Sequence, residues 1–145
     1  MDKIILGLLL GDGHLQCRNK NSRFFYNQSS LRNHHLNYFN HINYLFKPYI
    51  SEEFKIKPNS FVNKLNNKTY SSVYLATLTL PCFYYYIIIK LFYNSNTNNN
   101  KIIPLNINKL LTPRGLAYWI MDDGSIIIIV PNQGLHLNIY GWAPI

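Results

Sequence analysis

Two stretches of the sequence share one pattern, an apolar run that ends in a carboxylate followed by glycine. The first covers residues 4–13 (IILGLLLGDG) and the second covers residues 116–124 (LAYWIMDDG). Each run is about one helix long and puts an acid where the negative end of a helix dipole normally favours a cation. The chain has only six acidic residues, and three of them lie at these two ends: Asp12, Asp122 and Asp123. We interpret the pair as a candidate metal site.

The charge of the chain narrows the class of partner. In 145 residues there are 14 Lys and Arg against 6 Asp and Glu, a net charge of +8. This balance favours a polyanion such as nucleic acid over an acidic small molecule, although a merely basic soluble protein stays open as an alternative. The length favours a single domain. The two cysteines lack metal-ligand spacing and a disulfide framework, so we expect a reducing compartment.

Apolar segments of this chain are too short to cross a membrane, and we expect no membrane association. Residues 4–10 have the length of a minimal signal-peptide core but no cleavage pattern, so secretion is not expected. Heavy use of Asn, Ile, Tyr and Lys is typical of an AT-rich genome, which hints at an organelle.

Local patterns predict helices and antiparallel strands in alternation. After the first helix we expect a strand pair, a helix that Pro48 stops, a second strand pair and another helix, at residues 14–18, 23–29, 31–46, 61–65, 70–80 and 82–93. The turns between paired strands are predicted at residues 19–22 and 66–68. His34, His35 and His41 lack the helical spacing of a zinc pair.

A second, shorter series follows an Asn-rich linker at residues 94–100. Thr112 and Pro113 have the residue types of a helix N-cap and first helical position. Past the second motif we expect strands at residues 126–130 and 135–140, joined by a turn at 131–134. Both halves therefore start with helix, Asp-Gly and hairpin, which predicts an α+β protein with an internal repeat.

These residues resemble the LAGLIDADG homing endonucleases of the two-motif, single-chain type. Residues 5–13 (ILGLLLGDG) fit the first motif, and residues 111–125 (LTPRGLAYWIMDDGS) fit the second. The resemblance implies an αββαββα half-domain over residues 1–93, a linker and lead-in over 94–111, and the start of a second copy over 112–145.

The resemblance also implies a set of catalytic residues. Asp12 and Asp123 would be the metal-binding acids, with the main-chain carbonyls of Gly11 and Asp122 completing the shell of a Mg²⁺ ion. Lys101 sits where relatives carry a basic residue beside the scissile phosphate, and Gln28 sits where a polar residue orders solvent. The alternatives are a helix-ending Asp-Gly turn at Asp12 and surface roles for Lys101 and Gln28.

Helix packing and DNA contacts follow from the same resemblance. Gly7 and Gly11 would let the two motif helices approach, against Ala117 and Tyr118 of the second helix, and close approach would depend on the first helix. Strand residues facing the major groove of double-stranded DNA would be Gln16, Arg18, Arg23, Asn27, Lys64, Lys68 and Tyr70.

The end of the sequence departs from the family pattern. Residues 135–142 (LHLNIYGW) keep the frame of a family segment, but Ile139 and Tyr140 replace Thr and Gln. We expect a C-terminal half that is truncated, so that cleavage is impaired unless a partner chain supplies the rest; otherwise the family implies a monomer.

Site-specific DNA cleavage in support of an organellar, for instance mitochondrial, intron is the expected function. An RNA maturase that helps its own group I intron to splice is the alternative, with intron RNA as partner, and an inactive remnant is a third interpretation. Retention of both acids favours nuclease ancestry.

Overall fold

The computed structural model describes residues 2–18, 21–29, 33–54, 56, 58–84, 92–93, 101–129 and 132–137. The chain divides into two compact units, one made of Met1–His14 with Tyr84–Ile145 and the other of Leu15–Phe83. The boundaries predicted from the sequence follow the repeated motifs, whereas this division follows contacts. It places both motif helices in the same unit.

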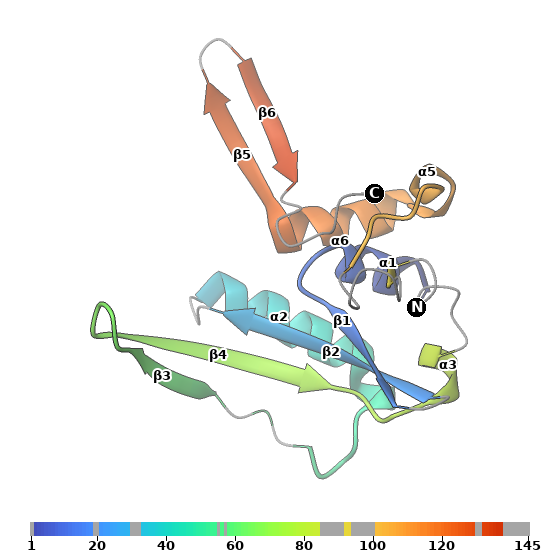
Figure 1. Cartoon of the computed structure of the whole chain (residues 1–145), viewed down its shortest axis with the longest axis vertical. Coiled ribbons are helices and arrows are strands. Elements are labelled where there is room, and N and C mark those ends of the chain that lie inside the picture. Colours follow the sequence, from blue (N-terminus) through green and yellow to red (C-terminus); the bar gives the residue numbers. More distant parts are fainter. Residues whose placement is uncertain are drawn as a thin grey trace. The chain divides into compact units, whose positions relative to one another are not determined.

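The order of elements is that of an α+β protein (Figure 1). The first series is α1 (Asp2–Leu10), β1 (His14–Arg18), β2 (Asn21–Ser29), α2 (Asn33–Phe46), the 3-10 helix η1 (Lys47–Tyr49), β3 (Asn59–Asn63), β4 (Lys68–Ala76) and α3 (Pro81–Tyr84). The second series is α5 (Ile107–Leu110), α6 (Pro113–Asp123), β5 (Gly124–Ile129) and β6 (Asn132–Leu137). The predicted α+β class is confirmed, and the first series has the predicted order αββαββα.

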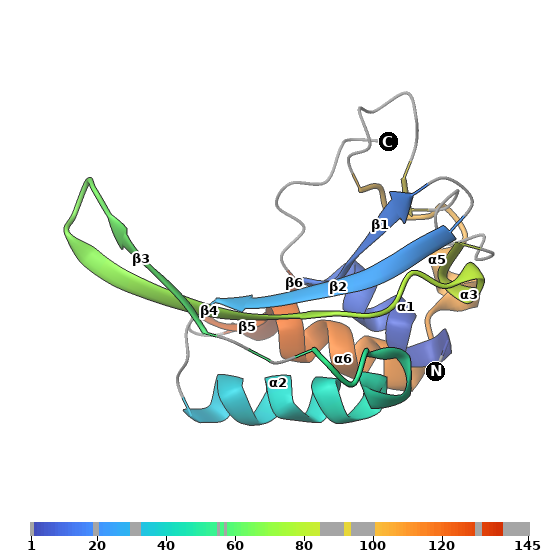
Figure 2. The same cartoon turned by 90° about the horizontal axis from the view of Figure 1, so that it is seen from below.

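In the unit Leu15–Phe83, a four-stranded sheet of order β1-β2-β4-β3 packs one face against α2 (Figure 2). Alternate residues of β2 and β4 are buried, and Phe24 of β2 stacks on Phe46 of α2 with ring centroids 4.5 Å apart. Tyr26 packs against Tyr38 and Phe39 of the same helix. The side chains that fill this core are Phe24, Tyr26, Phe39, Ile42, Phe46, Val73 and Leu75.

Strand ends differ from the predictions where asparagines form turns. The β3–β4 turn comes earlier than expected, because Leu65 N–H donates to Asn63 Oδ1 at 2.9 Å and Lys68 N–H donates to Asn66 Oδ1 at 3.0 Å. Asn67 completes this turn with a positive φ of 52°. The strands are therefore 59–63 and 68–76 rather than 61–65 and 70–80.

The strands that follow the other two predicted turns begin earlier than expected. Ser22 was predicted in a turn but is a buried residue of β2, where its N–H donates to the carbonyl of Leu80. Asn132 was also predicted in a turn but begins β6 opposite Ile129. The helix predicted at 82–93 begins as α3, while residues 85–91, the Asn-rich stretch 94–100 and residues 138–145 lie outside the described residues.

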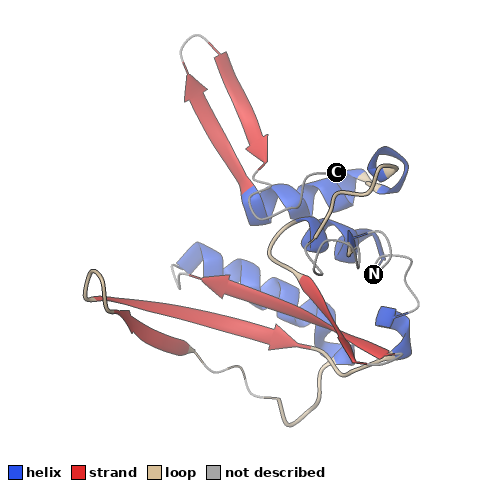
Figure 3. Cartoon of the chain, viewed as in Figure 1, coloured by secondary structure: helices blue, strands red, loops and turns tan. Residues whose placement is uncertain are grey.

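The other unit contains α1 and α6, packed against each other, and the β5–β6 hairpin that follows α6 (Figure 3). Its buried side chains include Leu8, Leu9 and Leu10 of α1 and Tyr118 and Trp119 of α6. The β5–β6 ladder runs from Gly124 opposite Leu137 to Ile129 opposite Asn132. Among the described residues, no helix is long and apolar enough to cross a membrane.

Candidate functional site

Glycines at three positions allow the backbones of α1 and α6 to approach. A Cβ atom at Gly7 would overlap the carbonyl of Gly115, and one at Gly11 would overlap the side chain of Asp122. A Cβ atom at Gly115 would lie 2.8 Å from the carbonyl oxygen of Lys3. Close packing of these helices therefore depends on both partners.

Three of the four residues predicted to pack between the motif helices lie in this contact. Tyr118 is 8% exposed, and its Cβ is 3.0 Å from the position of a Cβ on Gly7. Ala117, however, is exposed, and the small residue of α6 that meets α1 is Gly115. Gly115 was not among the predicted packing residues, because close approach was expected to depend on the first helix alone.

The start of α6 has the predicted cap. The side chain of Thr112 accepts a hydrogen bond from Gly115 N–H at 3.2 Å, and Pro113 occupies the first helical turn. The helix ends at Asp123, and Gly124 begins β5 without an intervening loop. The cap fixes where α6 begins, and the direct passage into β5 fixes where it ends. Asp122 and Asp123 are therefore the last two residues of the helix.

Four charged groups of one unit form what we call the acid–lysine cluster, namely Asp12, Asp122, Asp123 and Lys101. Asp12 N–H donates to Asp122 Oδ2 at 3.3 Å. Lys101 Nζ donates to two carbonyls at the end of α1, that of Gly11 at 2.7 Å and that of Leu9 at 3.1 Å. A β-bridge between Lys101 and Tyr93 and a hydrogen bond from Ile102 N–H to Phe92 O hold the backbone of this lysine.

The members of the cluster shift one another's pKa values. The pKa of Asp12 is raised to about 6, because burial and, to a lesser degree, repulsion from Asp123 raise it more than attraction to Lys101 lowers it. Burial likewise raises the pKa of Asp123, against Lys101. Burial lowers the pKa of Lys101, while Asp12, Asp123 and Asp122 oppose this shift. When all four groups are ionised, the cluster has three carboxylates and one ammonium group, and its net charge is negative.

The donors of the cluster fit a hard divalent cation. Carboxylate and main-chain carbonyl oxygens are the ligands that Mg²⁺ and Ca²⁺ take in proteins. Within the part of the chain that the structure describes, no three His, Cys, Asp or Glu side chains gather around one metal position. The Gly11 carbonyl, predicted as a metal ligand, is hydrogen-bonded to Lys101. The ammonium group of Lys101 therefore supplies positive charge at this predicted metal ligand.

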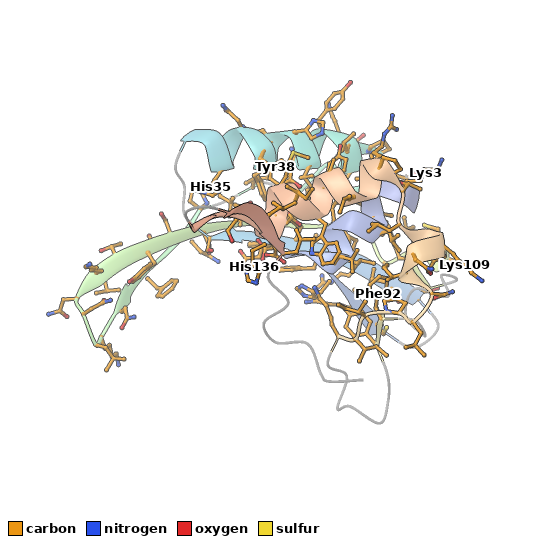
Figure 4. All side chains as sticks on the ribbon, turned by 90° about the horizontal axis from the view of Figure 1, so that it is seen from above. Lys3, His35, Tyr38, Phe92, Lys109 and His136 are labelled. Carbon is orange, nitrogen blue, oxygen red and sulfur yellow. The ribbon has the colours of Figure 1, made fainter. Side chains whose placement is uncertain are left out.

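Gln28, predicted to order solvent, lies in the unit Leu15–Phe83. Its side chain is 8% exposed, and Oε1 accepts a hydrogen bond from Tyr26 Oη at 2.9 Å. Its Nε2 lies 3.5 Å from Nδ1 of His35 on α2, a residue labelled in Figure 4 together with Tyr38. These contacts tie Gln28 to the packed side of the sheet, and its catalytic role stays a prediction.

The opposite face of the same sheet carries most of the residues predicted to contact DNA. Asn27 lies opposite Tyr74 in the β2–β4 ladder, and Arg23 Nε donates to Gln16 Oε1 across β1 and β2 at 2.8 Å. In the β3–β4 ladder, Lys68 lies opposite Asn63 and Tyr70 lies opposite Phe61.

The remaining two predicted DNA contacts are less defined. Lys64 is exposed in the β3–β4 turn, whereas the side chain of Arg18 lies outside the described residues. No Asp or Glu occurs between residues 13 and 51 or between residues 54 and 121, so none lies on the strands of this sheet. Its charge suits a polyanion.

One unit of this α+β chain has two acid-ended helices packed through glycines, and the other has a sheet whose open face carries polar and basic residues. The sequence matches the LAGLIDADG DNA endonuclease family over residues 2–142, and the chain belongs to this family. Membership implies use of a divalent metal ion.

Individual relatives include both nucleases and a maturase. The chain is 29% identical to the DNA endonuclease I-ChuI of Chlamydomonas applanata over 85% of this chain and 56% of that protein. It is also 29% identical to the cytochrome b mRNA maturase bI2 of Saccharomyces cerevisiae, over 83% of this chain and 29% of that protein.

A solved structure supports the fold. The homing endonuclease I-WcaI, bound to its DNA recognition sequence, superposes with a TM-score of 0.68 at 24% identity. The match covers 86% of this chain and 50% of that one. The chain thus spans about half the length of these nucleases.

Proposed function

We propose that this chain is a homing endonuclease that recognises a specific double-stranded DNA sequence and hydrolyses phosphodiester bonds with Mg²⁺. The observation that supports this most is the packing of α1 on α6, because it puts Asp12 and Asp123 into one electrostatic cluster with Lys101. The two acids come from copies of one motif 111 residues apart in the sequence. A purely structural Asp-Gly turn would not require this proximity.

Each member of the cluster has a distinct proposed role. Asp12 and Asp123 would hold the divalent ion, which when bound would activate water and neutralise charge on the phosphate. Asp12 must be ionised for this, and its raised pKa of about 6 predicts that activity falls below that pH. Lys101 contributes a fixed positive charge beside the acids, where negative charge develops on the phosphate in the transition state.

DNA binding would use the open face of the sheet. Arg23 and Gln16 form a hydrogen-bonded pair there, which pre-orders the guanidinium for contact with phosphate or a base edge. Asn27, Lys68 and Tyr70 continue the same face toward the β3–β4 turn, where Lys64 adds charge. Arg18 on β1 completes the proposed set.

Cleavage of the duplex formed by the joined exons that flank the coding intron tests this proposal. The purified chain with Mg²⁺ should cut that duplex, and Asp12→Asn or Asp123→Asn should each reduce the rate at least about 100-fold, the scale seen when one transition-state contact is lost. Glu53→Gln, which removes an acid outside the cluster, should leave the rate unchanged. Failure to cut any duplex in a randomised plasmid library would overturn the proposal.

RNA splicing is the second candidate function. It is favoured by the similarity to the cytochrome b mRNA maturase over 83% of this chain. Tight binding to the intron RNA that survives Asp12→Asn and Asp123→Asn, without DNA cleavage, would select the maturase. Under either function we propose that the chain is encoded in an intron of a mitochondrion or another organelle.

A further inference from the structure

The end of the β3–β4 hairpin is a two-stranded ribbon that is exposed on both faces. Phe61 and Val62 are neighbours on β3, so their side chains point to opposite faces, yet each is 58% exposed. Leu65 in the turn is 97% exposed. Figure 2 shows β3 and β4 continuing past the end of α2, the helix that covers the rest of this sheet. These apolar side chains therefore add nothing to the core.

Two aromatic rings on one face of this ribbon are held in a fixed arrangement. Phe61 lies directly opposite Tyr70, and their rings stack with centroids 5.7 Å apart and an interplanar angle of 23°. Asn66 Nδ2 donates to Tyr70 Oη at 3.0 Å, which ties the polar end of that ring to the turn. The pair, which we call the aromatic pair, is preformed although 42% of Tyr70 is exposed.

The surroundings of the aromatic pair are basic and polar. The next cross-strand pair on the same face is Asn63 with Lys68, and Lys64 follows in the turn. No Asp or Glu occurs between residues 54 and 121. An apolar patch bordered by lysines and free of acids complements a polyanion that also offers an apolar group.

We propose that the aromatic pair recognises the C5-methyl groups of thymines in the major groove of the DNA. This inference rests on the proposed function and extends it to sequence preference. A two-stranded ribbon fits the major groove, and the thymine methyl is the apolar group that base edges offer there. Phe61 has no hydrogen-bonding group, and the Tyr70 hydroxyl already accepts from Asn66, so both rings are suited to a methyl contact.

The part of the open face on β1 and β2 carries amide and guanidinium groups, which the aromatic pair lacks. Arg23, Gln16 and Asn27 carry hydrogen-bonding groups on β1 and β2, which suit bases with donors and acceptors. The inner strands also carry Phe25 and Tyr74 on this face, but these rings are half-buried and stack on each other, and Tyr74 packs against Phe54, whereas the aromatic pair at the hairpin end is exposed. We expect thymine preference at the positions that the β3–β4 hairpin covers and a different preference elsewhere in the site.

Removal of single methyl groups from the DNA tests the inference directly. The wild-type chain first selects duplexes from a randomised pool, and each thymine of the selected site is then replaced by deoxyuridine, which lacks only the C5-methyl. At one or more thymines the Kd should rise about four-fold, the value of one buried methyl group. In Phe61→Ser the same replacement should change the Kd less than about two-fold.

A matched control and three contrary outcomes make the test decisive. Val62→Ser removes an equally exposed apolar side chain from the opposite face and should keep the thymine dependence. Insensitivity of the wild-type chain to every deoxyuridine overturns the inference but leaves the proposed function standing. Loss of a dimer on Phe61→Ser, seen by sedimentation, would assign the patch to a second copy instead. If no duplex is selected at all, the proposed function fails too.

Discussion

The two motif helices end in similar residues but in different surroundings. At the end of α1, the carbonyls of Leu9 and Gly11 accept from Lys101, a side chain about 90 residues later in the chain. At the end of α6, Gly124 N–H donates to Ile120 O, and β5 begins at once. A repeated motif can therefore give an asymmetric site, in which Asp12 follows a helix end bound by Lys101 and Asp123 is the last residue of α6.

Substitution of the glycines between the helices should have the largest effect on stability. The loss should be greater at Gly7 of α1 than at Gly115 of α6. Gly7→Ala would put a Cβ atom into the backbone of α6, so we expect a loss of about 3 kcal/mol in the free energy of unfolding, despite the better helix propensity of alanine. Gly115→Ala should cost less, because its nearest contact is 2.8 Å. Chemical denaturation measures both.

Gly134→Ala is the control for these glycine variants, since nothing lies within 4 Å of a Cβ atom there. Its effect should stay below about 0.5 kcal/mol. Equal effects at Gly7 and Gly134 would mean that α1 and α6 do not pack through their glycines in solution.

Substitution of Lys101 should have the next largest effect on stability. It should destabilise the end of α1 more than the end of α6. Lys101→Met removes two hydrogen bonds to α1 carbonyls and leaves Asp12 and Asp123 to repel each other, so we expect a loss of about 2 kcal/mol. Hydrogen exchange at the end of α1 should increase more than at the end of α6. Lys109→Met is the matched control, because Lys109 is exposed (Figure 4); an equal loss there would contradict the tether.

Much of the fold followed from sequence, because its signals are local. The strand at residues 14–18 has the predicted bounds, and Thr112 caps α6 through its own side chain, as residue type and Pro113 indicate. Val73 and Leu75 of β4 are buried at alternate positions, as the period of a strand requires. Turn lengths were less predictable, because turn-forming residues such as Asn132 and Gly134 can also pair in a ladder.

The site was predictable only in part, because its contacts join distant segments. Asp12 and Asp123 follow from the motif, but the bonds of Lys101 to Leu9 and Gly11 depend on where the chain returns after residue 100. Gly115 was missed although it sits three residues from Thr112 and before Tyr118. A search for small residues at three- and four-residue spacing on the second helix would have found it.

The pH dependence of stability follows from the raised pKa of Asp12. The folded chain binds a proton at this carboxyl more tightly than the unfolded chain does, so protonation stabilises the fold. The contribution of this group is therefore present at about pH 4 and is lost as the pH rises through about 6. A divalent ion should reverse the trend by favouring the ionised form.

If Asp12, Asp123 and Lys101 form one electrostatic cluster, the titration of Asp12 must depend on the other two residues. In carboxyl ¹³C NMR of the metal-free chain, Asp12 should titrate near pH 6. Asp123→Asn should lower this midpoint by removing a repelling charge, and Lys101→Met should raise it by removing an attracting one. A midpoint near the ordinary value of about 4 that neither variant moves would contradict the account.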